Sequence, residues 1–163
     1  MPRILGIDPG IRRTGYGVVD AEGGAFRCVE AGVVKPPPHA PLAERLLRIE
    51  SDLDAVIARV RPAACALESV FQHKSARSAL TLGQAQAAAV LAAARRGLPV
   101  SLYNPSEVKQ ALTGGGRAAK EQVRFMVERI LGRDLAGEPD DLSDALAVAI
   151  CHGGRAAARG AAP

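Results

Sequence analysis

Several residue types that mark particular classes of protein are scarce in this 163-residue sequence. It has no tryptophan, and aromatic residues make up only 3% of the chain. No apolar run approaches the roughly 20 residues that a membrane-spanning helix requires. The first residues, MPRILGID, lack the basic, apolar and small-residue segments of a signal peptide. We therefore expect a soluble, cytoplasmic protein without a membrane partner.

Cysteine is also scarce. Cys28, Cys65 and Cys151 are an odd number, lie far apart and form no C-x-x-C pair. This spacing does not favour a disulfide scaffold, a zinc site or a redox pair. We interpret the three residues as free, buried thiols in a reducing compartment.

The length and charge of the chain narrow its class. A chain of this length can form a single sizeable core, so we expect one domain. Its net charge of +4 and pI near 9.3 are moderately basic. Such a charge is compatible with a polyanionic partner such as nucleic acid, although it does not establish one.

Hydrophobic patterns predict a mixed sheet covered by helices. Strand patterns occupy residues 3–8, 14–20, 26–34, 64–68 and 98–103. The first three are separated by short turns and predict an antiparallel meander, whereas later strands follow helices, as parallel crossovers require. We therefore predict an α/β fold with a five-stranded mixed sheet and helices on both faces.

The expected helices have clear boundaries. One amphipathic helix runs from Leu42 to Val60 before Pro62, and an alanine-rich helix from about Ser75 to Arg96. A shorter helix opens with the capping-box sequence NPSE at 104–107, and two more end at Gly132 and begin at Pro139. We expect the domain to cover 1–152 and a disordered tail to cover 153–163.

Four carboxylates at the ends of predicted elements are candidates for catalysis. Asp8 closes the first strand, although turn formation in D-P-G also explains it. Glu68 continues the apolar run ACAL, where an unpaired buried carboxylate would be costly. Asp141 and Asp144 lie on nearly the same face of the last helix. Helix capping explains one or two acids there, but not Asp144 directly before ALAVAI.

These acids predict a metal-dependent nuclease. If the first and fourth strands are neighbours, Asp8 and Glu68 meet at the edge where open α/β sheets bind ligands. The last helix can then add Asp141 and Asp144. Oxygen donors without histidine or thiolate favour Mg²⁺ or Mn²⁺ over zinc. Two such ions per site can activate water and stabilise the leaving oxygen of a phosphodiester.

Basic residues follow several of the same elements. For each one alone, a solvated surface charge is the simpler interpretation, but together they predict a path for a phosphate backbone. The candidates are Arg12, Arg13, Lys74, Arg77, Lys109, Arg117, Lys120 and Arg124. Phe71 stands in a polar, basic loop after Glu68, where it either stacks on an unpaired base or makes a core or lid contact.

Four strings of sequence, taken together and in order, resemble one family. GIDPGIRRTGYGVVD, ALESVFQHKSARSALTLGQA, NPSEVKQALTGGGRAAKEQV and DDLSDALAVAICH resemble the RuvC-type Holliday junction resolvases over about residues 3 to 152. The resemblance implies a ribonuclease H-like fold. It also implies a homodimer that binds four-way DNA junctions, nicks two strands symmetrically with Mg²⁺, and works beside a branch-migration motor in recombinational repair.

The resemblance also implies roles for single residues. Asp8, Glu68, Asp141 and Asp144 fall on the family's catalytic acids, and Phe71 on its junction-inserting aromatic residue. The alanine-rich helix falls where family members pair across the two-fold axis. The chain departs from the family pattern at Ser75 and in LGQAQA, which puts sequence preference and dimer packing in doubt but leaves the acids intact.

Three other functions are compatible with part of the pattern. A ribonuclease H-like nuclease that processes RNA would not prefer junctions. An actin-like ATPase or sugar kinase shares the GIDPG turn but needs two such domains, which 163 residues cannot hold. An architectural junction binder would use its acids only as helix caps and would keep its function if they were replaced.

Overall fold

The computed structural model describes residues 2–69 and 75–160. Within these residues the chain forms five strands and five helices. The strands are β1 (Arg3–Asp8), β2 (Thr14–Glu22), β3 (Ala25–Val34), β4 (Ala64–Glu68) and β5 (Val100–Tyr103). The helices are α1 (Leu42–Val60), α2 (Ala76–Arg95), α3 (Pro105–Thr113), α4 (Lys120–Leu131) and α5 (Asp140–Ala158).

The five strands form one mixed sheet in the order β3-β2-β1-β4-β5. β1 pairs antiparallel with β2, and β2 antiparallel with β3, as the short turns between them predict. β4 lies parallel to β1 on its other side, and β5 parallel to β4. The predicted five-stranded mixed α/β sheet is therefore confirmed.

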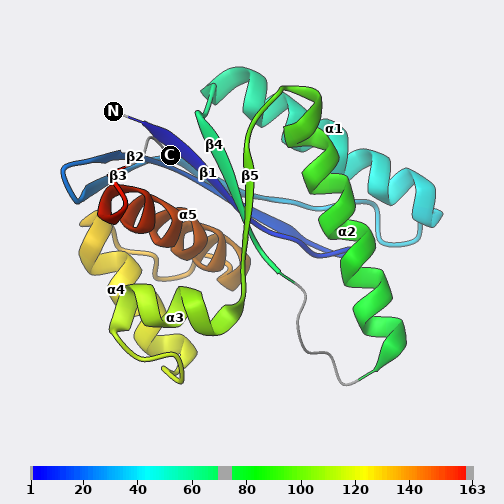
Figure 1. Ribbon diagram of the computed structural model, residues 1–163. Coiled ribbons are helices and arrows are strands. Elements are labelled where there is room, and N and C mark those ends of the chain that lie inside the picture. Colours follow the sequence, from blue (N-terminus) through cyan, green and yellow to red (C-terminus); the bar gives the residue numbers. More distant parts are fainter. Residues whose placement is uncertain (1, 70–74, 161–163) are drawn as a thin grey trace.

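Helices cover both faces of this sheet (Figure 1). α1 and α2 pack on one face, where their buried side chains join Leu5, Ile7 and Leu67 in one apolar cluster. α3, α4 and α5 lie on the other face, around a cluster that includes Ile4 and Leu146. In the described part of the chain, no helix is long and apolar enough to cross a membrane.

Strand periodicity decides which face each carboxylate occupies. Side chains alternate between the two faces of a strand, so Asp8 lies on the same face as Ile4, which packs with α5. The same alternation places Glu68 with Ala66, which belongs to the same cluster. Because Ile7 pairs with Leu67, the two acids end neighbouring parallel strands on one face.

Glycines on β1 and β2 allow α5 to lie unusually close to the sheet. A Cβ atom at Gly15 would overlap the backbone oxygen of Asp141, and one at Gly6 would overlap that of Ala145. At Gly17 the added atom would lie 2.7 Å from side-chain carbons of Leu146. The backbone of α5 thus rests on the sheet where larger side chains would hold it away.

The helix ends match the sequence signals in most places. Asn104 and Glu107 form the predicted capping box of α3, through the Asn104 side chain and the Glu107 carboxylate. The structure differs at the C-terminus, because α5 continues to Ala158 where a disordered tail from residue 153 is expected. Gly153 packs closely against Phe26 and Ile4, and the alanines that follow favour helix.

A substitution at Gly15 tests this close packing. In Gly15→Ala the new methyl group meets the backbone of α5, so we expect a loss of about 1–3 kcal/mol in the free energy of unfolding. Gly154→Ala is the control. Gly154 lies in α5, the helix that Gly15 contacts, and an added Cβ there meets nothing within 4 Å. We expect the control to gain up to about 1 kcal/mol. Urea denaturation of both variants measures the difference, and equal stabilities would contradict the packing argument.

Candidate active site

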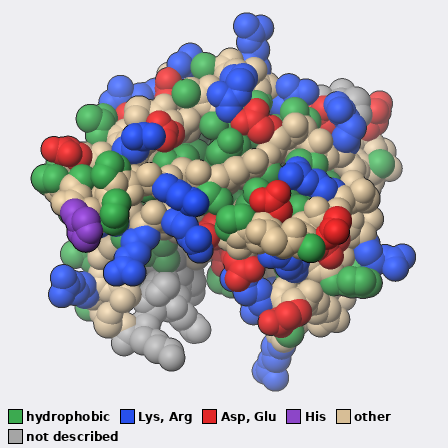
Figure 2. Space-filling model, turned by 180° about the vertical axis from the view of Figure 1, so that it is seen from behind, with side chains coloured by type: hydrophobic (Ala, Val, Ile, Leu, Met, Phe, Trp, Pro, Cys, Tyr) green, Lys and Arg blue, Asp and Glu red, His purple; other side chains and the backbone are tan. Residues whose placement is uncertain are grey.

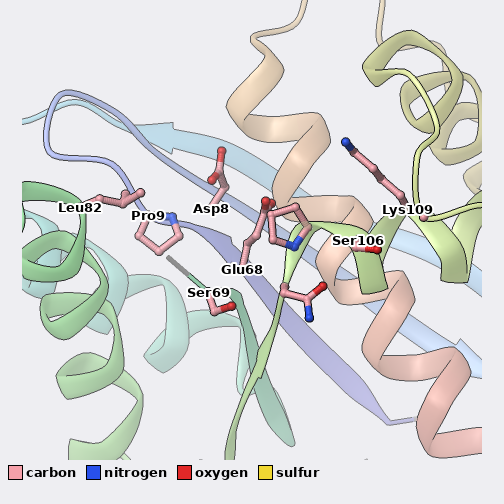
Figure 3. Close-up of a pocket in the computed structure, with 10 residues that line it drawn as sticks. Asp8, Pro9, Glu68, Ser69, Leu82, Ser106 and Lys109 are labelled. Atoms are coloured by element: carbon pink, nitrogen blue, oxygen red, sulfur yellow. The ribbon is translucent and has the colours of Figure 1, made fainter. Parts of the chain in front are cut away.

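Asp8 and Glu68 face a common cavity at the C-terminal ends of β1 and β4. The cavity has a volume of about 660 Å³, and its walls include Pro9, Ser69 and residues of α2 and α3. Figure 3 shows the two carboxylates between Leu82 of α2 on one side and Ser106 and Lys109 of α3 on the other. The parallel pairing of β1 with β4 therefore brings together two acids that are 60 positions apart in the sequence.

The N-terminal turns of α5 add two further carboxylates. Asp141 lies where α5 contacts Gly15, which is the cross-strand partner of Asp8. Asp144 follows one turn later and lines a second pocket together with Glu68, Lys109 and Lys120. The structure thus brings all four predicted acids into one electrostatically coupled group.

Burial and mutual repulsion change the protonation of this group. Burial, and after it the charges of Asp144, Glu68 and Asp141, together raise the pKa of Asp8 to about 8, against the opposing charge of Lys120. Burial also raises the pKa of Glu68 and that of Asp144. Four carboxylates in this position favour a positively charged partner, because ionised carboxylates repel one another.

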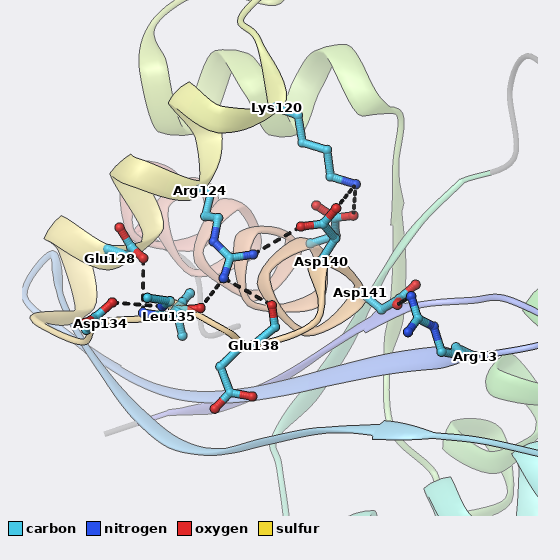
Figure 4. Close-up of polar contacts among 11 residues, drawn as sticks. Arg13, Lys120, Arg124, Glu128, Asp134, Leu135, Glu138, Asp140 and Asp141 are labelled. Atoms are coloured by element: carbon cyan, nitrogen blue, oxygen red, sulfur yellow. Dashed lines mark hydrogen bonds and ion pairs between the residues drawn. The ribbon is translucent and has the colours of Figure 1, made fainter.

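Basic side chains from three elements supply part of that charge. The ammonium group of Lys120 lies 3.2 Å from Oδ2 of Asp144 and 3.4 Å from Oδ2 of Asp140 (Figure 4). Lys109 and Lys120 both lower the pKa of Glu68 and oppose the effect of burial. Arg13 reaches Asp141 from the loop after β1, with 3.0 Å between Nη2 and Oδ2. The acids therefore face a rim of positive charge.

A separate set of contacts fixes where α5 begins. Arg124 of α4 pairs with Asp140 at 3.1 Å and donates hydrogen bonds to the backbone carbonyls of Leu135 and Glu138 (Figure 4). Its guanidinium thus holds the loop before α5 against α4. Arg124 was a candidate for phosphate contact, but its side chain is engaged within the protein.

The donor set fits a hard divalent cation, although the acids are not gathered into a cage. Among the described residues, no group of three or more His, Cys, Asp or Glu side chains is arranged to hold a metal ion. Lys120 and Arg13 instead draw Asp144 and Asp141 toward themselves. Oδ2 of Asp141 is buried and accepts no hydrogen bond, although it forms an ion pair with Arg13. Unsatisfied carboxylate oxygens are the donors that Mg²⁺ and Mn²⁺ prefer.

The structure places the predicted DNA-contacting residues in three groups. Lys109 and Lys120 border the carboxylates, and Arg12 and Arg77 line a groove between α1 and α2. Arg117 is exposed in the loop before α4. Phe71 and Lys74 lie outside the described residues.

Sequence reasoning missed one basic residue of this region. Arg45 stands near the start of α1, between Leu42 and Ile49 on the helix face that turns toward the sheet, and Nη2 donates to the carbonyl of Ile11 at 2.9 Å. An arginine within an apolar stripe was the available signal. The polar wall residues Ser69, Asn104 and Ser106 carried no comparable pattern.

Comparison with known proteins identifies relatives along nearly the whole chain. The family model described as crossover junction endodeoxyribonuclease RuvC matches residues 4–152. The chain is 52% identical to the crossover junction endodeoxyribonuclease RuvC of Frankia casuarinae, over 92% of this chain and 88% of that protein. It is 50% identical to that of Pelotomaculum thermopropionicum, over 91% of each.

A solved structure agrees with these relatives. RuvC of T. thermophilus in complex with a Holliday junction substrate superposes with a TM-score of 0.92 at 41% identity, covering 100% of this chain and 99% of that one. The yeast mitochondrial Holliday junction resolvase Ydc2 shares the fold with a TM-score of 0.65 at 14% identity, over 96% of this chain and 81% of the other.

The raised pKa of Asp8 predicts how stability depends on pH. In metal-free buffer the folded protein holds a proton on Asp8 up to about pH 8, whereas the unfolded chain releases it near 3.8. Folding therefore becomes less favourable as the pH rises between these values. In Asp8→Asn this loss disappears, so we expect the variant to gain stability over the native protein across that window, by about 1 kcal/mol or more at pH 8.

Denaturation at pH 4.5, 6 and 8 in EDTA measures this gain. Asp140→Asn serves as the control, since Asp140 is exposed and pairs with two basic residues. A stability difference between Asp8→Asn and the native protein that stays constant over pH would contradict the prediction.

Proposed function

Because the chain belongs to the RuvC family of crossover junction endodeoxyribonucleases, we propose that its four clustered carboxylates are the site at which a DNA junction is cut. The protein is a junction-resolving endonuclease of DNA recombination and repair. One observation carries the assignment of the site. Acids from β1, β4 and α5 converge beside basic residues at one edge of the sheet, where each alone would be costly to bury.

We propose that Asp8, Glu68, Asp141 and Asp144 hold two Mg²⁺ ions, with Mn²⁺ as a substitute. Such ions, when bound, supply a polarised water and neutralise charge on the leaving oxygen of a phosphodiester. The hard oxygen donors and the unsatisfied Oδ2 of Asp141 support this proposal.

The remaining residues of the site bind and orient the strand. Lys109 and Lys120 project from α3 and α4 toward the acids, where a phosphate oxygen would meet both charges. When a phosphodiester and cations occupy the site, Lys120 can exchange its pairing with Asp144 for a phosphate. In this way the same ammonium group stabilises the carboxylate cluster of the free protein and then the bound substrate.

We further propose that two copies pair through α2 and so cut two strands of one junction symmetrically. The face of α2 toward α1 and the sheet is formed by alanines such as Ala85 and Ala89. Its outward face carries Leu80 and Leu91, whose surfaces are 65% and 53% exposed, with the small residue Ala87 between them. An apolar stripe of this kind supports pairing with a second α2.

Cleavage of a synthetic four-way junction tests the proposed site. With Mg²⁺ we expect nicks in the junction and little cutting of linear duplex or of an RNA–DNA hybrid. Glu68→Gln and Asp144→Asn should lower the cleavage rate at least about 1,000-fold, because a site of metal ligands acts as a unit. Both variants should still bind the junction on native gels.

Asp140→Asn is the matched control for these variants. It neutralises an acid of α5 one turn before Asp144, but its side chain is 60% exposed, and we expect most activity to remain. Equal cutting of junction and duplex would contradict the assigned substrate. Full cleavage activity of Glu68→Gln would mean that the acids have only a structural role and are not the cleavage site.

A charged substitution on α2 tests the dimer. Leu91→Glu places a carboxylate in the proposed apolar contact and should weaken dimerisation at least about tenfold. Leu47→Glu is the control, because Leu47 is a 64% exposed leucine on α1. Light scattering measures the mass of each variant in solution. Cleavage of a plasmid with a cruciform then distinguishes paired nicks, which linearise the plasmid, from single nicks, which only relax it. A dimeric Leu91→Glu protein would place the interface elsewhere.

A further inference from the structure

A groove of about 570 Å³ lies beside the active-site cavity, between the loop after β1 and the first turns of α1 and α2. Arg12, Arg45 and Arg77 line it, and none of the described residues in its wall is acidic. Leu82 belongs to the walls of both the groove and the active-site cavity, so the two are adjacent. Figure 2 shows Lys and Arg side chains on the half of the molecule that holds α1 and α2, and others elsewhere on the same face.

Arg45 is the partly buried member of this arginine groove. Its Nη2 donates to the carbonyl of Ile11, but its Nε is buried without any acceptor. A buried N–H of a charged group that lacks a partner is costly, and native proteins rarely keep one without a reason. Its position adds to the cost, since the first turns of a helix favour acids over bases. The guanidinium thus has one internal hydrogen-bond acceptor, and its charge lines the groove.

The charge around Arg45 is also uncompensated. Within residues 2–69 and 75–160, none of Arg12, Arg45 and Arg77 forms an ion pair. Nearby arginines behave differently, because Arg13 pairs with Asp141 and Arg48 with Asp52. The N-terminal ends of two long helices border the same groove and add the positive ends of their dipoles.

The loop after β1 connects the groove to the reacting centre. Asp8 faces the cavity, and Ile11 and Arg12 of the same loop line the groove. Thr14 fixes the loop, since its hydroxyl donates to the carbonyl of Gly10 at 2.8 Å and accepts from its N–H at 3.1 Å. The hydrogen bond from Arg45 holds the other side of the loop. A strand that lies across the acids can therefore continue over Leu82 into the groove.

We propose that the arginine groove binds a backbone phosphate of the strand being cut, close to the cleaved bond, with the partly buried Arg45 as its anchor. Arg12 and Arg77 contact the same phosphate or its neighbour from the exposed rim. This inference rests on the proposed function, and it adds a specific phosphate site to it. Because phosphate contacts do not distinguish one base from another, the groove would fix the position of the strand in the site and not the sequence preference of cleavage.

Binding of a labelled four-way junction in EDTA, measured by fluorescence anisotropy over a range of KCl concentrations, tests the groove. Arg45→Gln should bind about tenfold more weakly, the effect of one charged hydrogen bond. The slope of log K against log salt should also fall by about 1, since one fewer phosphate is neutralised. Arg48→Gln, an exposed arginine of the same helix, is the matched control and should bind like the native protein.

A chemical change in the DNA identifies the contact as a phosphate. We would prepare a series of junctions, each with one neutral methylphosphonate linkage at a different position near the cleavage site. The native protein should bind more weakly when the linkage is at one or two of these positions. At those positions Arg45→Gln should show no further loss, because the charge it would contact is already absent. If the losses of binding free energy from the methylphosphonate and from Arg45→Gln add at every position, Arg45 does not contact the phosphate and the proposal is wrong.

A second variant covers a failure of Arg45→Gln to fold. The side chain of Arg77 is exposed and holds no described contact, so Arg77→Gln should fold and still lose affinity and salt slope. Native affinity and slope in Arg77→Gln and in any folded Arg45→Gln would overturn the groove while leaving the nuclease intact. Absence of junction cleavage by the native protein would instead contradict the proposed function, so the two failures are distinguishable.

Discussion

The close contact between α5 and the sheet determines the rest of the site. Gly15 lies under the first turn of this helix and the cross-strand pair Gly6 and Gly17 farther along it, and their missing side chains let its backbone rest on β1 and β2. Asp141 is positioned by the contact at Gly15, which is opposite Asp8 in the strand pair. The distance between acids of the strands and acids of the helix is thus set by backbone packing and not by flexible side chains.

This packing opposes the electrostatics of the site. Ionised carboxylates held together by a rigid framework cannot move apart, so their repulsion appears as raised pKa values and as a demand for cations. Part of the negative charge is compensated by basic side chains from α3, α4 and the loop after β1, namely Lys109, Lys120 and Arg13. Stability and the proposed function compete here, because the arrangement that weakens the free protein is the one that we propose binds metal ions and phosphate.

Much of the fold could be predicted from the sequence because its signals are local. The capping box at Asn104 and the apolar run ending in Glu68 are complete within a few residues, and the structure has both features. The convergence of the acids could be expected only by assuming that β1 and β4 are neighbours. The partners of Arg13 and Arg124 could not be foreseen, since an ion pair depends on elements far apart in sequence. The predicted start of the tail, at residue 153, lies inside α5. A glycine in a sequence suggests the end of a helix, whereas Gly153 allows α5 to pack closely against Phe26 and Ile4.

The order of the elements along the chain has a consequence for synthesis. Two acids of the site, Asp8 and Glu68, belong to the first half of the chain, whereas Asp141 and Asp144 lie in its last helix. A nascent chain therefore carries an incomplete cluster until α5 has emerged from the ribosome and docked on its glycines. A fragment truncated before Pro139 keeps four of the five helices but lacks half of the acids. With the acids in the catalytic role that we propose, the fold withholds the ability to cut DNA from unfinished or broken copies of the enzyme.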